Sequence, residues 1–119
     1  MAHVAAQTER TMLSANVTNL PLRQPVLIAR GAITVDLLSG GRFELGIGAG
    51  GFWDAIQAAG GRRLSPGQAV DALEEAIRVI RAVWAVDEPG GVHIDGEYYQ
   101  VLGAKRGPRS GRRRARRLS

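Results

Sequence analysis

The order of extended and helical segments constrains the fold of this chain more than any other feature. Residues 11–18 and residues 42–48 each alternate apolar and polar side chains, which is typical of strands. Between them, a stretch with apolar residues at helical spacing begins at Pro25 and ends at Gly40 and Gly41. A strand followed by a helix and a second strand indicates parallel pairing with a right-handed crossover.

The second half of the chain predicts two more helical segments and a hairpin. Residues 52–59 form a short helical turn, and a longer helix begins after Ser65, where Ser65 and Gln68 match a capping box. Residues 92–99 predict a small hairpin around an Asp-Gly turn. The longer helix repeats apolar residues at three- and four-residue steps, which predicts a core-facing side. That side consists of Val70, Leu73, Ile77, Ile80 and Trp84.

Two architectures share this order: a doubly wound sheet and an arc of a (β/α)₈ barrel. In both, binding sites lie at the carboxyl ends of the strands. The first strand leads into Asn19 and the second into the glycine-rich residues 48–51. We therefore expect an amide side chain and a bare backbone loop at one rim. Glycines let backbone N–H groups approach a phosphate, so a phosphate-bearing cofactor is one interpretation, and a plain tight turn is the other.

Gly46, Gly48 and Gly51 also satisfy the dinucleotide fingerprint G-x-G-x-x-G. That fingerprint requires a long helix directly after it and an acidic residue at the end of the next strand, about 20 residues on. Here the following helix is cut short by two glycines, and Asp71, at about that distance, lies inside the capped helix. A Rossmann nucleotide site is therefore disfavoured.

Two longer stretches resemble a known family. They are TNLPLR at residues 18–23 and DLLSGGRFELGIGAG at residues 36–50. Both resemble the bacterial-luciferase-like family of flavin-dependent monooxygenases and deazaflavin-dependent dehydrogenases and reductases. FWD at residues 52–54 and AVDALEEAI at residues 69–77 continue the similarity, which covers roughly residues 5–107.

The resemblance implies an α/β fold in which residues 1–108 form part of a (β/α)₈ TIM barrel, with its third and fourth strand–helix units and the hairpin. In relatives, the third strand has a bulge that supports the isoalloxazine ring, and this bulge would fall at Asn16 and Val17. Asn19 matches a flavin-contacting residue, and the loop of Ala49 and Gly50 matches one that lies against the cofactor. The cofactor-binding candidates are Asn16, Val17, Asn19, Gly48, Ala49, Gly50 and Asp54.

The family also implies an activity. We expect a flavin-dependent oxidoreductase that uses FMN or a deazaflavin coenzyme, in the first instance a monooxygenase that acts on paired donors with incorporation or reduction of molecular oxygen. A deazaflavin-dependent dehydrogenase or reductase is the alternative. Some deazaflavin relatives have a glutamate directly after the position of Gly50, where this chain has Gly51. The earlier strands that supply substrate and proton-transfer residues in relatives are missing, so we assign no catalytic residue and expect little activity from this chain alone.

Other chemistry is poorly supported. The chain has no cysteine, which excludes disulfides, thiolate metal sites and a cysteine nucleophile. His3 and His93 have no metal-ligand or base partner nearby in the sequence, so no metal site is expected. No apolar run is long enough for a membrane span, and no secretory signal is visible, so we expect a cytoplasmic protein with an unknown small-molecule substrate.

The net charge of +5 arises at the carboxyl-terminal end. Residues 105–119 contain eight basic residues and no acidic one, which leaves residues 1–104 with 8 basic and 11 acidic residues, a net charge of −3. Residues 109–119 fit a basic tail that binds nucleic acid or another acidic surface, or the product of a shifted reading frame, which we favour. We expect this segment to be disordered, and we expect open strand edges to permit self-association.

Overall fold

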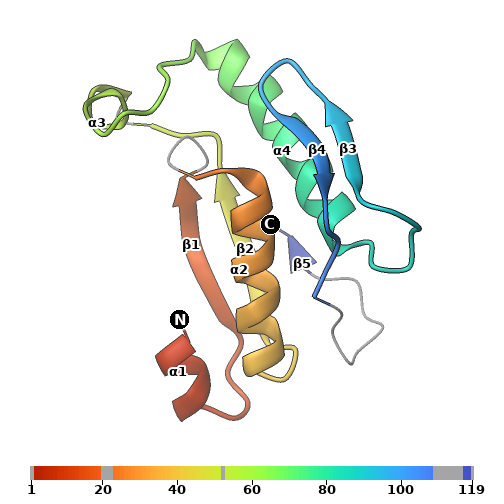
Figure 1. Cartoon of the computed structure of the whole chain (residues 1–119). Helices are drawn as coiled ribbons and strands as arrows, with labels where there is room; N and C mark the ends of the chain where they lie inside the picture. Colours follow the sequence, from red (N-terminus) through yellow and green to blue (C-terminus); the bar gives the residue numbers. More distant parts are fainter. Residues whose placement is uncertain (1, 20–22, 52, 109–116, 119) are drawn as a thin grey trace.

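The computed structural model describes residues 2–19, 23–51, 53–108 and 117–118 (Figure 1). Within these residues the chain forms helices and strands in alternation, followed by a hairpin. The elements are α1 (Ala2–Gln7), β1 (Leu13–Asn19), α2 (Pro25–Leu38), β2 (Phe43–Gly48), α3 (Trp53–Ala58), α4 (Pro66–Trp84), β3 (Val92–Asp95), β4 (Gln100–Ala104) and β5 (Arg117–Leu118). In the described residues, no helix is long and apolar enough to cross a membrane.

β1 and β2 pair in parallel, and α2 forms the crossover between them. Leu13 lies opposite Phe43 at the amino end of the pair, and Asn19 lies opposite Gly48 at the carboxyl end. The two arrows point the same way in Figure 1, with α2 in front of them. The predicted strand–helix–strand unit is therefore confirmed.

Local sequence signals explain where α2 begins and ends. Pro25 occupies the first helical position, where its missing N–H leaves no hydrogen bond unmade. After Leu38, the Gly41 N–H donates to Asp36 O at 2.7 Å, and both Gly40 and Gly41 have positive φ. Glycine accepts that backbone conformation without steric cost, so the chain can reverse into β2.

The capping box predicted for α4 is present. The Gln68 N–H donates to Ser65 Oγ at 3.3 Å, and the Ser65 N–H donates to Gln68 Oε1 at 2.9 Å. The predicted buried face was wrong in part, because Val70 is 59% exposed while Ile80 is fully buried. The side of α4 that packs inward is Ala69, Ala72, Glu75, Ala76, Val79, Ile80 and Val83. Its alanines fit a short interaxial distance, and α4 packs beside α2.

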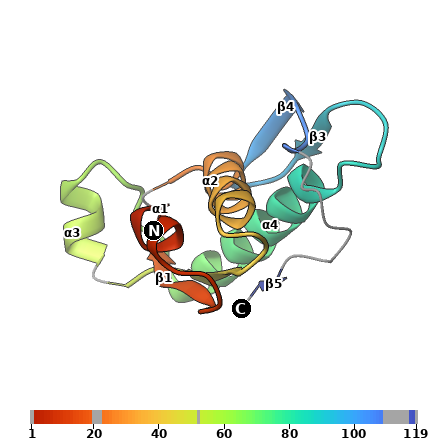
Figure 2. The same ribbon diagram turned by 90° about the horizontal axis from the view of Figure 1, so that it is seen from below.

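The core lies between the β1–β2 sheet, α2 and α4, and it extends to the hairpin (Figure 2). The indole Nε1 of Trp84 donates to Ala29 O at 3.0 Å, which joins the end of α4 to the middle of α2. The buried residues of this core include Leu13, Ile28, Ala29, Phe43, Leu45, Val79, Ile80, Val83, Val92 and Val101.

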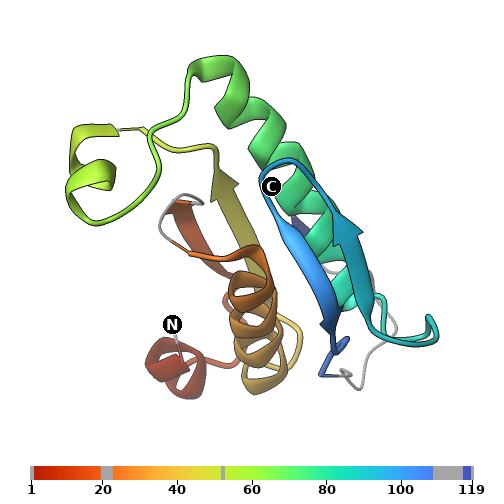
Figure 3. The same ribbon diagram turned by 45° about the horizontal axis from the view of Figure 1, so that its top comes forward.

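β3 and β4 form an antiparallel hairpin beside α4 (Figure 3). The hairpin was expected within residues 92–99, but its second strand begins only at Gln100. The Gly96 N–H donates to Tyr99 O at 3.0 Å, so residues 96–99 form the connecting loop. Glu75 of α4 contacts this loop, because its carboxylate accepts from the N–H groups of Tyr98 and Tyr99.

Of the basic segment 109–119, the structure describes only Arg117 and Leu118. They form β5 and pair in parallel with Glu44 and Leu45 of β2, where we had expected disordered chain. Residues 109–116 and 119 lie outside the described residues, so the disorder expected there stays a prediction.

Candidate cofactor-binding site

The carboxyl ends of β1 and β2 bring the principal candidate residues together. Asn19 and Gly48 are direct partners across the parallel pair, and each is the last residue of its strand. The start of α4 and the loop between β3 and β4 lie toward the same end of the molecule (Figure 1). This is the end at which parallel α/β folds place their sites.

The predicted bulge is present in β1. Ala15 pairs with Leu45, but the next pair is Thr18 with Ile47, so β1 has one residue more than β2 over this interval. The extra residue falls at Asn16 and Val17, the positions to which the family resemblance assigned it. A bulge adds a residue without a ladder partner and bends its strand, which exposes backbone groups next to the site.

The loop after β2 has the backbone properties expected of a ligand-binding loop. Gly50 has φ +110°, a conformation that other residues rarely adopt. A Cβ atom added to Gly51 would meet no heavy atom within 4 Å, so open space adjoins the backbone there. Ala49, Gly50 and Gly51 follow directly after β2, so their backbone lies at the carboxyl end of the parallel pair. Backbone N–H groups beside open space are donors that an anionic or carbonyl-bearing ligand can use.

Asp54 lies apart from this arrangement. It is in the first turn of α3, its side chain is almost fully exposed, and its carboxylate forms an ion pair with Arg63. Arg63 also donates to Gln57 Oε1 at 3.1 Å, so the pair belongs to the outer surface of the α3–α4 connection. Exposed ion pairs of this kind contribute little to stability, and a cofactor contact at Asp54 stays a prediction.

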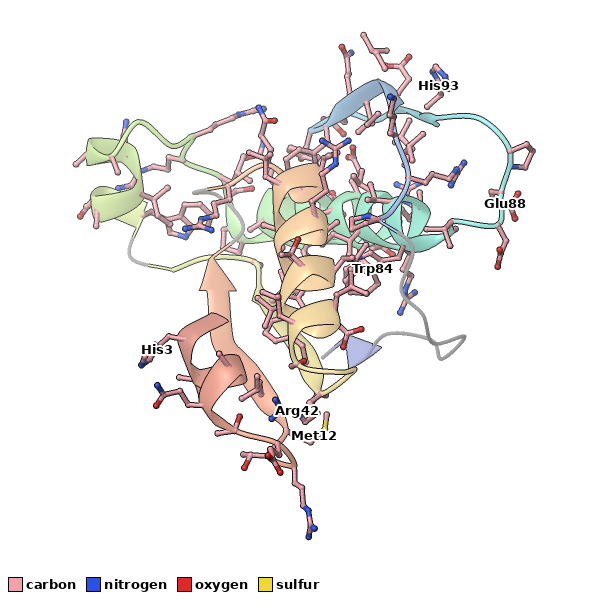
Figure 4. All side chains as sticks on the ribbon, turned by 60° about the horizontal axis from the view of Figure 1, so that its bottom comes forward. His3, Met12, Arg42, Trp84, Glu88 and His93 are labelled. Carbon is pink, nitrogen blue, oxygen red and sulfur yellow. The ribbon has the colours of Figure 1, made fainter. Side chains whose placement is uncertain are left out.

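The two histidines remain separate from the site and from each other. His3 is exposed on α1, and His93 is exposed on β3, at opposite ends of the view in Figure 4. The structure therefore offers no reason to give either imidazole a role in proton transfer.

Sequence reasoning missed Glu75, a buried carboxylate in the middle of α4. Its Oε1 accepts from the N–H of Tyr98 at 3.1 Å and of Tyr99 at 3.4 Å. Partial burial, and secondly the charge of Glu75, raise the pKa of Tyr99 above its usual value. No local signal distinguishes Glu75 from the exposed Glu74, because its burial depends on a loop more than twenty residues further along the chain.

The stretch that most resembles the family lies partly at the opposite end of the sheet. The Phe43 N–H donates to Asp36 Oδ1 at 3.3 Å, and Ser39 Oγ donates to Asp36 O at 3.1 Å. These bonds fix the turn between α2 and β2. At the amino end of a barrel strand such residues serve stability, whereas residues at the carboxyl end serve the site.

The sequence profile of the luciferase-like monooxygenase family matches residues 1–116. The chain belongs to this family. The matched range includes both strand–helix units and the hairpin, and it runs past the point near residue 107 where we expected the resemblance to end. A luciferase-like origin thus accounts for the parallel pair, its bulge and the glycine-rich rim together.

Curated relatives of this luciferase-like chain have more than one kind of activity. It is 33% identical over 106 residues to an F420-dependent glucose-6-phosphate dehydrogenase of Amycolatopsis mediterranei, which covers 88% of this chain and 31% of the relative. It is 34% identical over 89 residues to the 4-hydroxyprotoasukamycin monooxygenase of Streptomyces nodosus subsp. asukaensis, which covers 75% of this chain and 23% of the relative. The chain therefore spans about a quarter to a third of the length of these relatives.

Solved structures show the same fold. The monooxygenase RslO1 of Streptomyces bottropensis superposes on 98% of this chain with a TM-score of 0.80, over 34% of its own chain, at 23% identity. The oxygenating constituent of 3,6-diketocamphane monooxygenase of Pseudomonas putida, solved in complex with FMN, superposes on 87% of this chain with a TM-score of 0.71, over 28% of its own chain, at 26% identity. Both are luciferase-like TIM barrels, so the fold expected from the sequence is confirmed as part of such a barrel.

Proposed function

We propose that this luciferase-like chain forms part of a flavin-binding site, and that the whole protein is a flavin-dependent monooxygenase with FMN as its cofactor. The observation that carries the proposal is the pairing of Asn19 with Gly48 beside a glycine loop that has a positive φ at Gly50 and open space at Gly51. Backbone donors at the end of a strand suit the polar edge of a ring and its phosphate, and an asparagine is a residue type that can add an amide contact.

In this proposal the residues of the chain bind and orient, and none is assigned as catalytic. Ala49 and Gly50 would donate backbone hydrogen bonds to the cofactor, and Gly48 would allow its close approach. Asn16, Val17 and Asn19 would support the ring from β1. When bound, the flavin supplies the redox chemistry, which protein side chains alone do not provide.

A deazaflavin coenzyme is the second candidate, and the relatives support it equally. The dehydrogenase of Amycolatopsis mediterranei, which is 33% identical to this chain, is F420-dependent by name. The candidate residues do not discriminate between the two cofactors, because backbone donors and an amide suit both. At Gly51 the chain differs from some deazaflavin relatives, which carry a glutamate at this position, and this difference favours the monooxygenase.

Titration with FMN and with F420, followed by cofactor fluorescence, tests the site and identifies its ligand. The test variant is Gly51→Leu, because a side chain at Gly51 enters space that the described protein atoms leave open. The matched control is Gly31→Leu in α2, where an added Cβ also meets nothing within 4 Å. We expect the affinity for one cofactor to fall by about tenfold or more in Gly51→Leu, which corresponds to roughly 1.4 kcal/mol, and to be unchanged in Gly31→Leu. Equal affinity in both variants would contradict the proposed site.

Two further expectations, nucleic-acid binding and self-association, stay predictions. Nucleic-acid binding depends on the basic segment 109–119, most of which is not described. Self-association would use the outer edge of β1, which has no strand partner among the described residues. The salt dependence of nucleic-acid binding tests the first expectation, and the mass of the protein in solution tests self-association.

A further inference from the structure

Arg42 joins three segments at the amino end of the sheet, far from the candidate site. Its Nε donates to Ser39 O at 2.6 Å, in the turn between α2 and β2. Its Nη1 donates to Thr8 Oγ1 and Thr11 O, and its Nη2 donates to Thr8 O, each at 2.8 Å. Arg42 O also accepts from the Leu13 N–H at 2.8 Å. Figure 4 shows Arg42 beside the lower part of β1, close to Met12.

These contacts bear on the register of β1. The strand holds one residue more than β2 between its two paired stretches, so its register differs at its two ends. If the upper pairing of Asn19 with Gly48 continued downward without a bulge, Ala15 rather than Ser14 would lie opposite Glu44. The extra residue would then leave the strand at its amino end.

We propose that Arg42 is a positioning residue that prevents this slip and so keeps the bulge of β1 at Asn16 and Val17. The guanidinium of Arg42 donates to Thr8 and Thr11, in the chain before β1. The backbone carbonyl of Arg42 accepts from the N–H of Leu13, the first residue of the strand. Irregular backbone persists only where the surrounding structure determines it from both sides. The functional consequence rests on the proposed function, because the bulge matters to catalysis only if it supports a cofactor.

Arginine suits this role better than lysine. Its planar guanidinium presents several donors in fixed directions, and here three of its nitrogens serve acceptors on two different segments. Arg30 provides a contrast within the same molecule, since it is exposed and its guanidinium donates to one carbonyl among the described residues, Lys105 O, at 3.3 Å.

Disulfide trapping tests the register directly, because the chain contains no cysteine of its own. Ser14→Cys with Glu44→Cys joins partners in the observed register. Ala15→Cys with Glu44→Cys joins positions that become partners only after the slip. Direct neighbours on paired strands lie within the Cα separation that a disulfide requires. With Arg42 present, we expect the Ser14 pair to oxidise faster than the Ala15 pair.

In an Arg42→Met background we expect this preference to reverse, and in an Arg30→Met background we expect it to persist. If Arg42→Met does not fold, Thr8→Val removes one acceptor, and it should bring the two oxidation rates closer together. An unchanged preference in whichever of these two variants is folded overturns the assignment.

Cofactor affinity separates this inference from the proposed function. If Arg42→Met reverses the preference between the two cysteine pairs and also weakens the binding of FMN or F420, the result supports the register role of Arg42 and the proposed cofactor site. If the preference between the cysteine pairs reverses while the affinity for FMN and F420 is unchanged, the result supports the register role and counts against the proposed cofactor site.

Discussion

Glu75 and Gly96 lie in direct contact, with the carboxylate of one filling the space where the other would carry a Cβ atom. Gly96 belongs to the loop between β3 and β4, and Glu75 belongs to α4. The absence of a side chain at Gly96 thus lets the helix hold the hairpin through a buried acid.

We expect Gly96→Ala to lower the free energy of unfolding by about 1–3 kcal/mol, because the new methyl group displaces the carboxylate from its donors. Chemical denaturation measures the change. Gly31→Ala is the control, since its Cβ meets nothing within 4 Å, and helix propensity favours alanine there. Equal stability of the two variants would show that the contact is not tight.

Glu75→Gln should also destabilise the protein, by roughly 1–3 kcal/mol, because an amide offers one acceptor where the carboxylate offers two. Glu75 is only 6% exposed and accepts from the N–H groups of Tyr98 and Tyr99. The neighbouring Glu74→Gln, on the exposed side of α4, should change stability by less than about 0.5 kcal/mol. Slower amide exchange at Tyr98 in the Glu75 variant would contradict this account.

Tyr99 predicts a stability loss at alkaline pH. Burial and the charge of Glu75 raise its pKa in the folded protein above its usual value of 10.0. The neutral phenol is therefore favoured by folding, and this contribution is present below pH 10 and is lost as the pH rises through the folded pKa. Tyr99→Phe should show a smaller loss of melting temperature above pH 10 than the parent protein. A matched decline in both proteins would refute the assignment.

Gly50→Ala addresses the site loop itself. At φ +110° an alanine is strained, so we expect a loss of roughly 1–3 kcal/mol in the free energy of unfolding. Gly51→Ala, at the next position, has no positive φ and open space, and should be nearly neutral. Thermal melts of Gly50→Ala and Gly51→Ala test whether the loop has a positive φ at Gly50 alone, in which case only the first variant melts at a lower temperature.

The sequence predicted the parts of the fold that depend on local chemistry. Pro25 and the glycines after Leu38 determine the ends of α2, and Ser65 with Gln68 determines the start of α4. The bulge at Asn16 and Val17 was accessible only through the family resemblance, because its existence depends on the length of the partner strand.

Long-range packing explains what the sequence did not predict. Val70 matched the helical apolar pattern, yet the inward side of α4 is built on alanines that pack beside α2. Glu75 is a residue type that is usually exposed, and it is buried here because the hairpin loop covers it. The ion pair of Asp54 with Arg63 at the surface was likewise not predicted, and a cofactor contact at Asp54 stays a prediction.

Backbone amide chemical shifts recorded during cofactor titration test the central claim most directly. Upon addition of FMN or F420, the account predicts saturable shifts at Ala49, Gly50 and Gly51, with little change at Gly40 and Gly41 at the other end of the sheet. Shifts confined to the amino end of the sheet, or saturable binding that leaves residues 49–51 unaffected, would contradict it.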